Sequence, residues 1–199
     1  MKVLLIGASG AIGRAVHQRL GQQHEVLTAG RHSGQFRVDI TDQASVRRLL
    51  AEVGPIDALV STTGDVHFGP LAEMTDEQFN VGLQGKLLGQ VRLALLGQHV
   101  LRNGGSITLT AGIVSREPIR LGANATAVNA AIEGFARGAA IELPRGMRIN
   151  VVSPAVLTES LAAYGPYMPG MESVPAERVA LAYQRSVEGA QTGRTYFVE

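Results

Sequence analysis

Short apolar runs alternate with segments of helical periodicity along the whole chain, and this alternation limits the possible folds more than any other feature. The first apolar run covers residues 3–6, and Ile12, Val16 and Leu20 then recur at helical spacing. We predict strands over residues 3–6, 25–28, 36–40, 58–61, 106–110, 149–152 and 195–198. We predict the main helices over residues 12–20, 46–53, 83–101, 123–143 and 174–187, with a further helix opened by a capping box at residues 75–78. The pattern predicts an α/β fold, a doubly wound parallel sheet of about seven strands covered by helices on both faces in three α/β/α layers.

One connection between predicted strands is too short to contain a helix. Only about half a dozen residues join the second and third predicted strands, fewer than the roughly ten that a helical crossover needs. We predict a loop there in place of a helix. The stretch of Gly, Pro and Tyr at residues 164–170 is predicted to be a loop within the domain, and residues 1–199 are predicted to form a single domain.

The composition excludes several classes of function. The net charge is +1 with scattered basic residues, so neither nucleic acid nor an anionic membrane is indicated as a partner. The chain has no cysteine, which excludes disulfides and thiolate chemistry, and its five histidines lack metal-ligand spacing. The short apolar start matches neither a secretion signal nor a membrane span, so we expect a cytoplasmic protein.

A glycine-rich turn lies between the first predicted strand and the first predicted helix. Gly7 allows a sharp turn, Gly10 removes a side chain where backbone approaches a pyrophosphate, and Gly13 lets the helix pack closely on the strand. The helix N-terminus offers free N–H groups to phosphates. At this place in a Rossmann-type chain the motif predicts a dinucleotide site, with residues Gly7, Ser9, Gly10, Ala11, Ile12 and Gly13 as contacts.

The end of the second predicted strand indicates which dinucleotide binds. Folds that prefer NAD usually carry an Asp or Glu there, for the ribose 2′-hydroxyl. This chain has Arg31, with Ser33 close by. Because a guanidinium suits a 2′-phosphate, we predict that NADP(H) binds in preference to NAD(H).

Further motifs follow the glycine turn along the chain, at segments 39–40, 61–64, 132–135, 145–150, 152–154 and 193–196. With these motifs and the glycine turn, nearly the whole chain resembles the short-chain dehydrogenase/reductase family. The resemblance implies that Asp39 and Ile40 contact the adenine, that Thr62 and Gly64 follow the family's fourth strand, and that Pro154 and Leu157 lie at the nicotinamide. With the glycine turn, Arg31 and Ser33, these residues complete the predicted cofactor site.

The family's catalytic residues are absent from the aligned positions. Counting from these segments, the catalytic Tyr falls at Ala125, the Lys at Asn129 and the Ser at Gly112, or at Ala111 with a one-residue slip. The Asn of the preceding helix falls at Gly82. The chain thus resembles an atypical branch that keeps the cofactor site and lacks the usual Asn, Ser, Tyr and Lys.

Several residues near the predicted strand ends offer substitute chemistry. Asp65 and His67 follow the fourth strand, and Arg116 and Glu117 follow the fifth. Thr110 is the nearest hydroxyl to the missing Ser and is expected to be structural. Tyr164 and Tyr167 lie in a loop whose direction the sequence does not give.

Two functions remain open from the sequence. The first is an oxidoreductase that passes hydride between NADP(H) and an unknown carbonyl or alcohol at a non-standard active site. The second is a non-catalytic NADP(H)-binding or sensor protein. Two long helices, over residues 83–101 and 123–143, resemble those that pair in the family's oligomers, so we also expect a homodimer or homotetramer.

Overall fold

One parallel sheet of seven strands forms the centre of the molecule in the computed structural model, which describes residues 1–199. The strands are β1 (Lys2–Ile6), β2 (Glu25–Gly30), β3 (Phe36–Arg37), β4 (Ile56–Ser61), β5 (Leu101–Thr110), β6 (Arg148–Pro154) and β7 (Thr195–Val198). They lie in the order β3-β2-β1-β4-β5-β6-β7, and each neighbouring pair is parallel. The predicted Rossmann-type sheet is confirmed.

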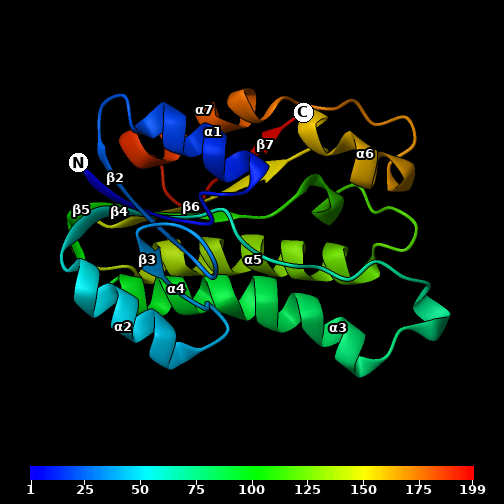
Figure 1. Cartoon of the computed structure of the whole chain (residues 1–199), viewed down its shortest axis with the longest axis horizontal. Coiled ribbons are helices and arrows are strands. Elements are labelled where there is room, and N and C mark those ends of the chain that lie inside the picture. Colours follow the sequence, from blue (N-terminus) through cyan, green and yellow to red (C-terminus); the bar gives the residue numbers. More distant parts are fainter.

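Helices cover both faces of the sheet. They are α1 (Ala11–Leu20), α2 (Gln43–Val53), α3 (Asp76–Gly82), a π-helical segment (Leu83–Leu88), α4 (Gly89–Gly97), α5 (Ala123–Glu142), α6 (Leu161–Tyr164) and α7 (Ala176–Glu188). Short 3₁₀ turns occupy Leu71–Glu73, Ile113–Ser115, Thr158–Ser160 and Gly165–Tyr167. Helices α1 and α7 lie on one side of the sheet, and α2, α4 and α5 lie on the other (Figure 1).

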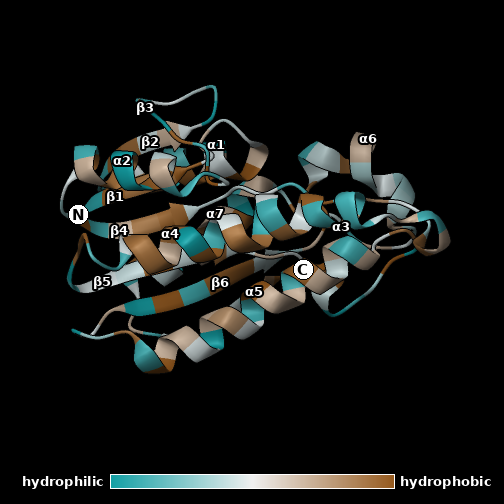
Figure 2. Ribbon diagram, turned by 90° about the horizontal axis from the view of Figure 1, so that it is seen from below, coloured by the Kyte–Doolittle hydropathy of each residue, from teal (hydrophilic) through white to brown (hydrophobic).

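The alternation of side chains along β1 shows why both faces are covered. Val3 and Leu5 belong to the apolar cluster under α1 and α7, whereas Leu4 and Ile6 belong to the cluster under α2, α4 and α5. All four side chains are essentially fully buried. The central strands are accordingly among the most hydrophobic segments in Figure 2. A strand buried on both faces must be apolar throughout, which is the pattern that the sequence displays.

The order of the strands reverses next to β1, since β2 and β4 flank it on opposite sides. Ile6 pairs with Ala29 on one side and with Ser61 on the other. In open α/β sheets such a reversal leaves a crevice beyond the carboxyl ends of the strands. The loops that follow β1, β2, β4, β5 and β6 therefore share one edge of the molecule.

Three predicted elements differ from the structure. The loop predicted at residues 164–170 contains the last residue of α6 and the 3₁₀ turn Gly165–Tyr167. The third strand has two residues in place of five, because the chain leaves the sheet at Asp39, whose N–H donates to Oγ of Ser45 and whose carboxylate accepts from the N–H of Thr41. The helix predicted over residues 83–101 is a π-helical segment followed by α4, and Leu101 already belongs to β5. The capping box at Thr75 and Gln78 forms as predicted.

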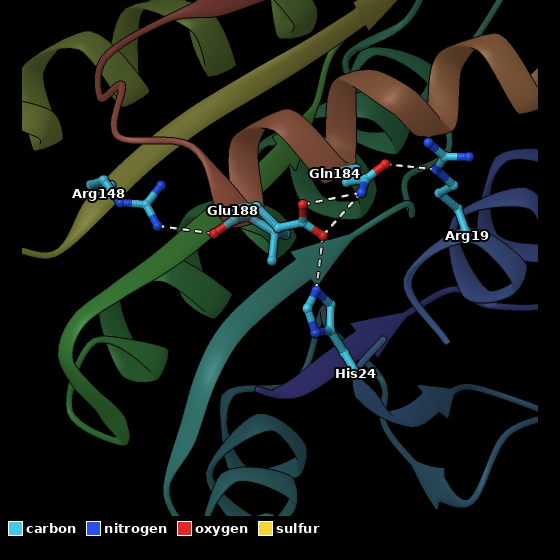
Figure 3. A network of polar contacts seen from close by, with 6 residues as sticks. Arg19, His24, Arg148, Gln184 and Glu188 are labelled. Atoms are coloured by element: carbon cyan, nitrogen blue, oxygen red, sulfur yellow. Dashed lines mark hydrogen bonds and ion pairs between the residues drawn. The ribbon is translucent and has the colours of Figure 1, made fainter. Parts of the chain in front are cut away.

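Helix α7 is held by polar contacts at its C-terminal end. Glu188 accepts hydrogen bonds from Gln184 and pairs with Nε2 of His24 at 2.9 Å, and Arg19 of α1 donates to Gln184 at 2.6 Å (Figure 3). Arg148 of β6 donates to the main-chain oxygen of Val187 at 3.0 Å. These contacts tie α7 to α1 and β6.

None of the helices combines the length and the apolar character that crossing a membrane requires.

Candidate functional site

The glycine-rich turn after β1 is closely packed. Gly7 has a φ of +92°, and a Cβ atom added to Gly13 would lie 2.1 Å from the Gly7 carbonyl oxygen. Helix α1 begins at Ala11 with no side-chain cap, which leaves its first N–H groups available to a ligand. Thr62 of the neighbouring loop donates to the carbonyl oxygen of Gly7 at 3.1 Å. The turn and the loop after β4 thus form one packed unit.

A cleft of about 280 Å³, here called the polar cleft, opens beside this turn. It brings together eight of the residues predicted to bind the cofactor, namely Gly7, Ser9, Gly10, Arg31, Ser33, Ile40, Thr62 and Gly64. Asp65 also lines it. The loops after β1, β2, β3 and β4 all contribute to this cleft.

Arg31 stands at the outer end of the polar cleft. Its side chain is 51% exposed, and its Nη2 lies 3.8 Å from Oδ1 of Asp39. Asp39 accepts hydrogen bonds from the hydroxyl and the N–H of Thr41, and these bonds, with a smaller contribution from Arg31, lower the pKa of its carboxyl group. The Arg31 guanidinium is therefore oriented by a weak ion pair and open to solvent.

A second cavity of about 250 Å³, here called the inner cavity, adjoins the polar cleft. The two share Thr62, Thr63 and Gly64. The predicted cofactor residues Ile12, Pro154 and Leu157 line the inner cavity, as do Ala111, Gly112, Ala125 and Asn129. The positions at which the usual catalytic Ser, Tyr and Lys are missing therefore share one cavity.

Three predicted cofactor residues line neither space: Ala11, Gly13 and Asp39. Gly13 instead meets the backbone of Gly7 and Ala8, where no side chain fits. Its contribution is the packing of α1 on β1.

Lys86 is a functional candidate that the sequence analysis missed. It lines the inner cavity from the π-helical segment, and its Nζ lies 3.5 Å from the carbonyl oxygen of Ala111. Burial lowers the pKa of this ammonium to about 8, although the charge of Asp65 raises it. Gly82, the position expected to face the site, lies instead against the side chain of Asn124. Lys86 was not singled out because no rule of helical periodicity anticipates a π turn.

The buried floor of the inner cavity is built from hydroxyl groups and an amide. Thr110 donates to the main-chain oxygen of Ser61 at 2.6 Å and contacts the hydroxyl of Tyr183 on α7. Gln90 of α4 makes two hydrogen bonds, both 2.8 Å, to the backbone of Thr110. Burial raises the pKa of Tyr183 far above its usual range. Thr110 is fully engaged in structural contacts, as expected.

The other candidate acids and bases are dispersed. Arg116 stacks on Phe197 at 4.3 Å and lies 3.5 Å from Glu199, so it is turned toward the C-terminus. Glu117 and His67 line neither the polar cleft nor the inner cavity. The outer wall of the inner cavity contains Phe68 and Tyr164, whose ring centroids are 5.9 Å apart. Tyr167 stacks on the same Phe68 at 5.0 Å and does not line the cavity.

No cluster of three or more His, Cys, Asp and Glu side chains is arranged to hold a metal ion.

The chain is similar to known reductases along almost its entire length. The family model described as enoyl-(acyl carrier protein) reductase matches residues 7–194. The 3-oxoacyl-[acyl-carrier-protein] reductase FabG of Escherichia coli strain K12 is 28% identical over 229 aligned positions, which cover 98% of this chain and 94% of that protein. Since the alignment is longer than this chain of 199 residues, FabG contains segments that this chain lacks.

Solved structures share the fold closely. The protein lin1944 from Listeria innocua is 51% identical, with a TM-score of 0.99 and full coverage of both chains. A small-chain dehydrogenase in complex with NADPH is 27% identical, with a TM-score of 0.89 and coverage of 100% of this chain and 96% of that one.

Proposed function

The chain belongs to the short-chain dehydrogenase/reductase family, and we propose that it is an NADP(H)-dependent oxidoreductase acting on a small carbonyl compound or the corresponding alcohol. The single observation that carries this proposal is the continuity of the two spaces. The polar cleft and the inner cavity join at Thr62, Thr63 and Gly64, so one extended ligand can enter both.

The residues present suit a dinucleotide phosphate. The uncapped start of α1 and the turn at Gly7 and Gly10 would hold the pyrophosphate, because free N–H groups and a helix N-terminus favour anions. Arg31 and Ser33 would hold a 2′-phosphate at the outer end of the polar cleft. The small-chain dehydrogenase that was solved with NADPH shares the fold over this whole chain, which supports the same choice of cofactor.

The inner cavity would hold the nicotinamide end and the substrate. When bound, the cofactor supplies or accepts a hydride. Ile12, Pro154 and Leu157 would orient the ring from one side, and the apolar wall with Phe68 and Met168 would exclude water around the reacting carbonyl. Ala111, Gly112 and Ala125 leave space that a larger substrate group can fill.

The experiment is to supply NADPH with ketones, aldehydes and quinones and to follow the loss of nicotinamide absorbance. Turnover of any one carbonyl, abolished when the polar cleft is blocked by the variant Gly10→Trp, is the expected result. Binding of NADPH without consumption over the whole panel would favour the alternative of an NADP(H)-binding sensor. Failure to bind NADPH would overturn both functions.

We also infer that copies of this chain associate as a homodimer or homotetramer through α4 and α5. Leu95 on α4 is 51% exposed and Ile141 on α5 is 87% exposed, so both helices present a large aliphatic side chain to solvent. The apolar groove between these helices has Phe135, Ala139 and Leu143 along it. Light scattering at micromolar concentration tests this association, and the mass of a single chain would contradict it.

A further inference from the structure

Lys86 is unusual in this chain because lysine is rare. Of the 18 basic residues, only Lys2 and Lys86 are lysines, and the others are arginines. Lys2 lies at the opposite end of β1, where its Nζ donates to the main-chain oxygen of Val53 at 2.8 Å. Of the two lysines, Lys86 is the one that lines the inner cavity.

The backbone around Lys86 is shaped to bring this side chain into the inner cavity. The π-helical segment Leu83–Leu88 widens the helix at this point, and such single wide turns often occur at functional sites. Gly64, with a φ of +130°, leaves room for the stem, since a Cβ atom there would lie 2.5 Å from Cγ of Lys86. The stem thus crosses the junction of the polar cleft and the inner cavity.

Most of the residues that line the inner cavity with Lys86 are apolar, among them Val66, Phe68, Val114 and Met168. The Nζ has one hydrogen bond, a long one of 3.5 Å to Ala111, so it retains donors for a ligand. This burial is the reason why the pKa of Lys86 falls to about 8, close to physiological pH.

Three other titratable groups surround the inner cavity. Asp65 lies on the adjoining polar cleft beside Gly85 and favours the charged form of Lys86. Tyr164 of α6 lines the outer wall, and Tyr183 of α7 lies behind Thr110. Among Lys86 and these three groups, Lys86 is the only cation, and its side chain lines the cavity.

Asn129 supplies an independent sign that a ligand belongs here. It lines the inner cavity from α5, is 3% exposed, and its Oδ1 is buried without any hydrogen-bond partner. A buried acceptor without a donor costs about 1–3 kcal/mol, so such groups are normally satisfied. A ligand with a hydroxyl or amide group would satisfy it.

We propose that the ammonium of Lys86 is the proton donor for reduction of an apolar aldehyde or ketone in the inner cavity, an inference that rests on the proposed function. A hydride from a reduced nicotinamide adds to the carbonyl carbon, and the electron pair of the C=O π bond moves onto oxygen. That oxygen takes a proton from Nζ of Lys86 to give the alcohol. The lysine is left as a neutral amine, which regains its proton from water at the junction with the polar cleft. Asn129 accepts a hydrogen bond from the hydroxyl of the product.

The identity of the residue matters to this role. A general acid works best when its pKa lies near the operating pH, which an arginine cannot achieve because it keeps its proton. An arginine at position 86 would therefore keep the positive charge and lose the proton transfer. This difference separates a proton donor from a residue that only provides charge.

The test compares Lys86→Arg and Lys86→Met with the native protein and with Lys2→Arg as the matched control. NADPH affinity is measured by nicotinamide fluorescence, and turnover is measured with 9,10-phenanthrenequinone, hexanal and cyclohexanone. We expect both Lys86 variants to bind NADPH within about threefold of the native affinity and to lose roughly 100-fold or more in kcat, the scale of general acid catalysis. Lys2→Arg should match the native protein in both measurements.

A second readout does not depend on turnover. In protein labelled with ¹³C-lysine, the two Cε signals report each lysine separately. We expect the Lys86 signal to titrate with a midpoint near pH 8. Addition of NADP⁺ should move the Lys86 signal and leave the Lys2 signal in place. The kcat for reduction should then fall about tenfold per pH unit above that midpoint, because the acid must be protonated.

The outcomes separate this proposal from the proposed function. Loss of NADPH binding in the native protein would overturn the proposed function itself. Intact NADPH binding with full activity in Lys86→Arg, or a Lys86 midpoint near the ordinary 10.5, would overturn the role of Lys86 alone. A native protein that binds NADPH but reduces none of the three carbonyls would overturn the role of Lys86 and favour the sensor alternative.

Discussion

The polar cleft and the inner cavity adjoin each other, yet they differ in how their residues affect the stability of the fold. Around the polar cleft the chain is packed so tightly that a methyl group on Gly13 would lie 2.1 Å from a backbone oxygen. The inner cavity instead contains groups that cost stability, the buried ammonium of Lys86 and the unpaired Oδ1 of Asn129. In the polar cleft, the glycine-rich turn that would hold the pyrophosphate also packs α1 on β1, so the same residues contribute to binding and to folding. The inner cavity holds groups whose presence only a ligand or a reaction explains.

The largest effect is expected from a methyl group in the packed region. Gly13→Ala should destabilise the fold by at least about 3 kcal/mol, because neither the backbone of Gly7 nor that of Ala8 can move away without shifting β1. Urea unfolding measures this change. Gly10→Ala in the same turn is the matched control, since the added Cβ would lie 3.7 Å from its nearest neighbour and Gly10 has an ordinary φ of −71°, and it should cost less than about 1 kcal/mol. Equal effects of the two variants would contradict the close packing.

In the inner cavity, a substitution is expected to increase the stability of the fold. Lys86→Met should raise the free energy of unfolding at pH 7 by up to about 3 kcal/mol, because the native protein holds a charge whose pKa falls from 10.5 to about 8 on folding. The unfolded chain binds more protons than the folded one between these values, so the native protein gains stability as the pH rises from about 8 to 10.5. The advantage of the variant should disappear over that window.

Urea unfolding at pH 7 and pH 10 checks this prediction. Lys2→Met is the control at the far end of β1, where the Nζ donates to the main-chain oxygen of Val53 and lies outside the inner cavity. A Lys86→Met protein that is less stable than the native one at pH 7 would show that the lysine is retained for structure, and the contrast between the two regions would fail.

A smaller change in stability is expected at the buried floor of the inner cavity. Tyr183→Phe removes the hydroxyl that contacts Thr110, while Thr110 keeps its bond to Ser61. The expected loss is about 1–1.5 kcal/mol of stability, the usual contribution of one buried hydrogen bond. Tyr164→Phe, at a side chain that is 43% exposed, should change stability by less than about 0.5 kcal/mol in the same thermal or urea melts. A Tyr183→Phe protein as stable as the native one would show that the contact contributes nothing.

The fold could be predicted from the sequence because its determinants are local. Apolar runs such as Val3–Ile6 and the capping box at Thr75 act within a few residues, and both form as expected. The strand predicted over 36–40 is shortened to Phe36–Arg37 because Asp39 turns away from the sheet through hydrogen bonds with Ser45 and Thr41. Such bonds join residues whose proximity no periodicity reveals.

The polar cleft could be predicted from the sequence better than the inner cavity. The polar cleft is made mostly of contiguous backbone, so the turn at Gly7 and Gly10 and the position of Arg31 could be located from the sequence. The inner cavity is made of single side chains from separate elements, and its Lys86 depends on a π-helical segment. One signal could have revealed Lys86, namely the rarity of lysine in an arginine-rich chain.

The identity of the cofactor is the central claim, and binding of NADPH and NADH by the native protein tests it most directly. Arg31 is half-exposed and already forms a weak ion pair with Asp39. We therefore expect a preference for NADPH of about 1 kcal/mol, or roughly fivefold in Kd. Nicotinamide fluorescence should show this preference in the native protein and in Arg47→Ala, an exposed arginine of α2 outside the cleft, and should show none in Arg31→Ala. Equal affinities of the native protein for NADPH and NADH, or a preference that survives Arg31→Ala, would contradict the account.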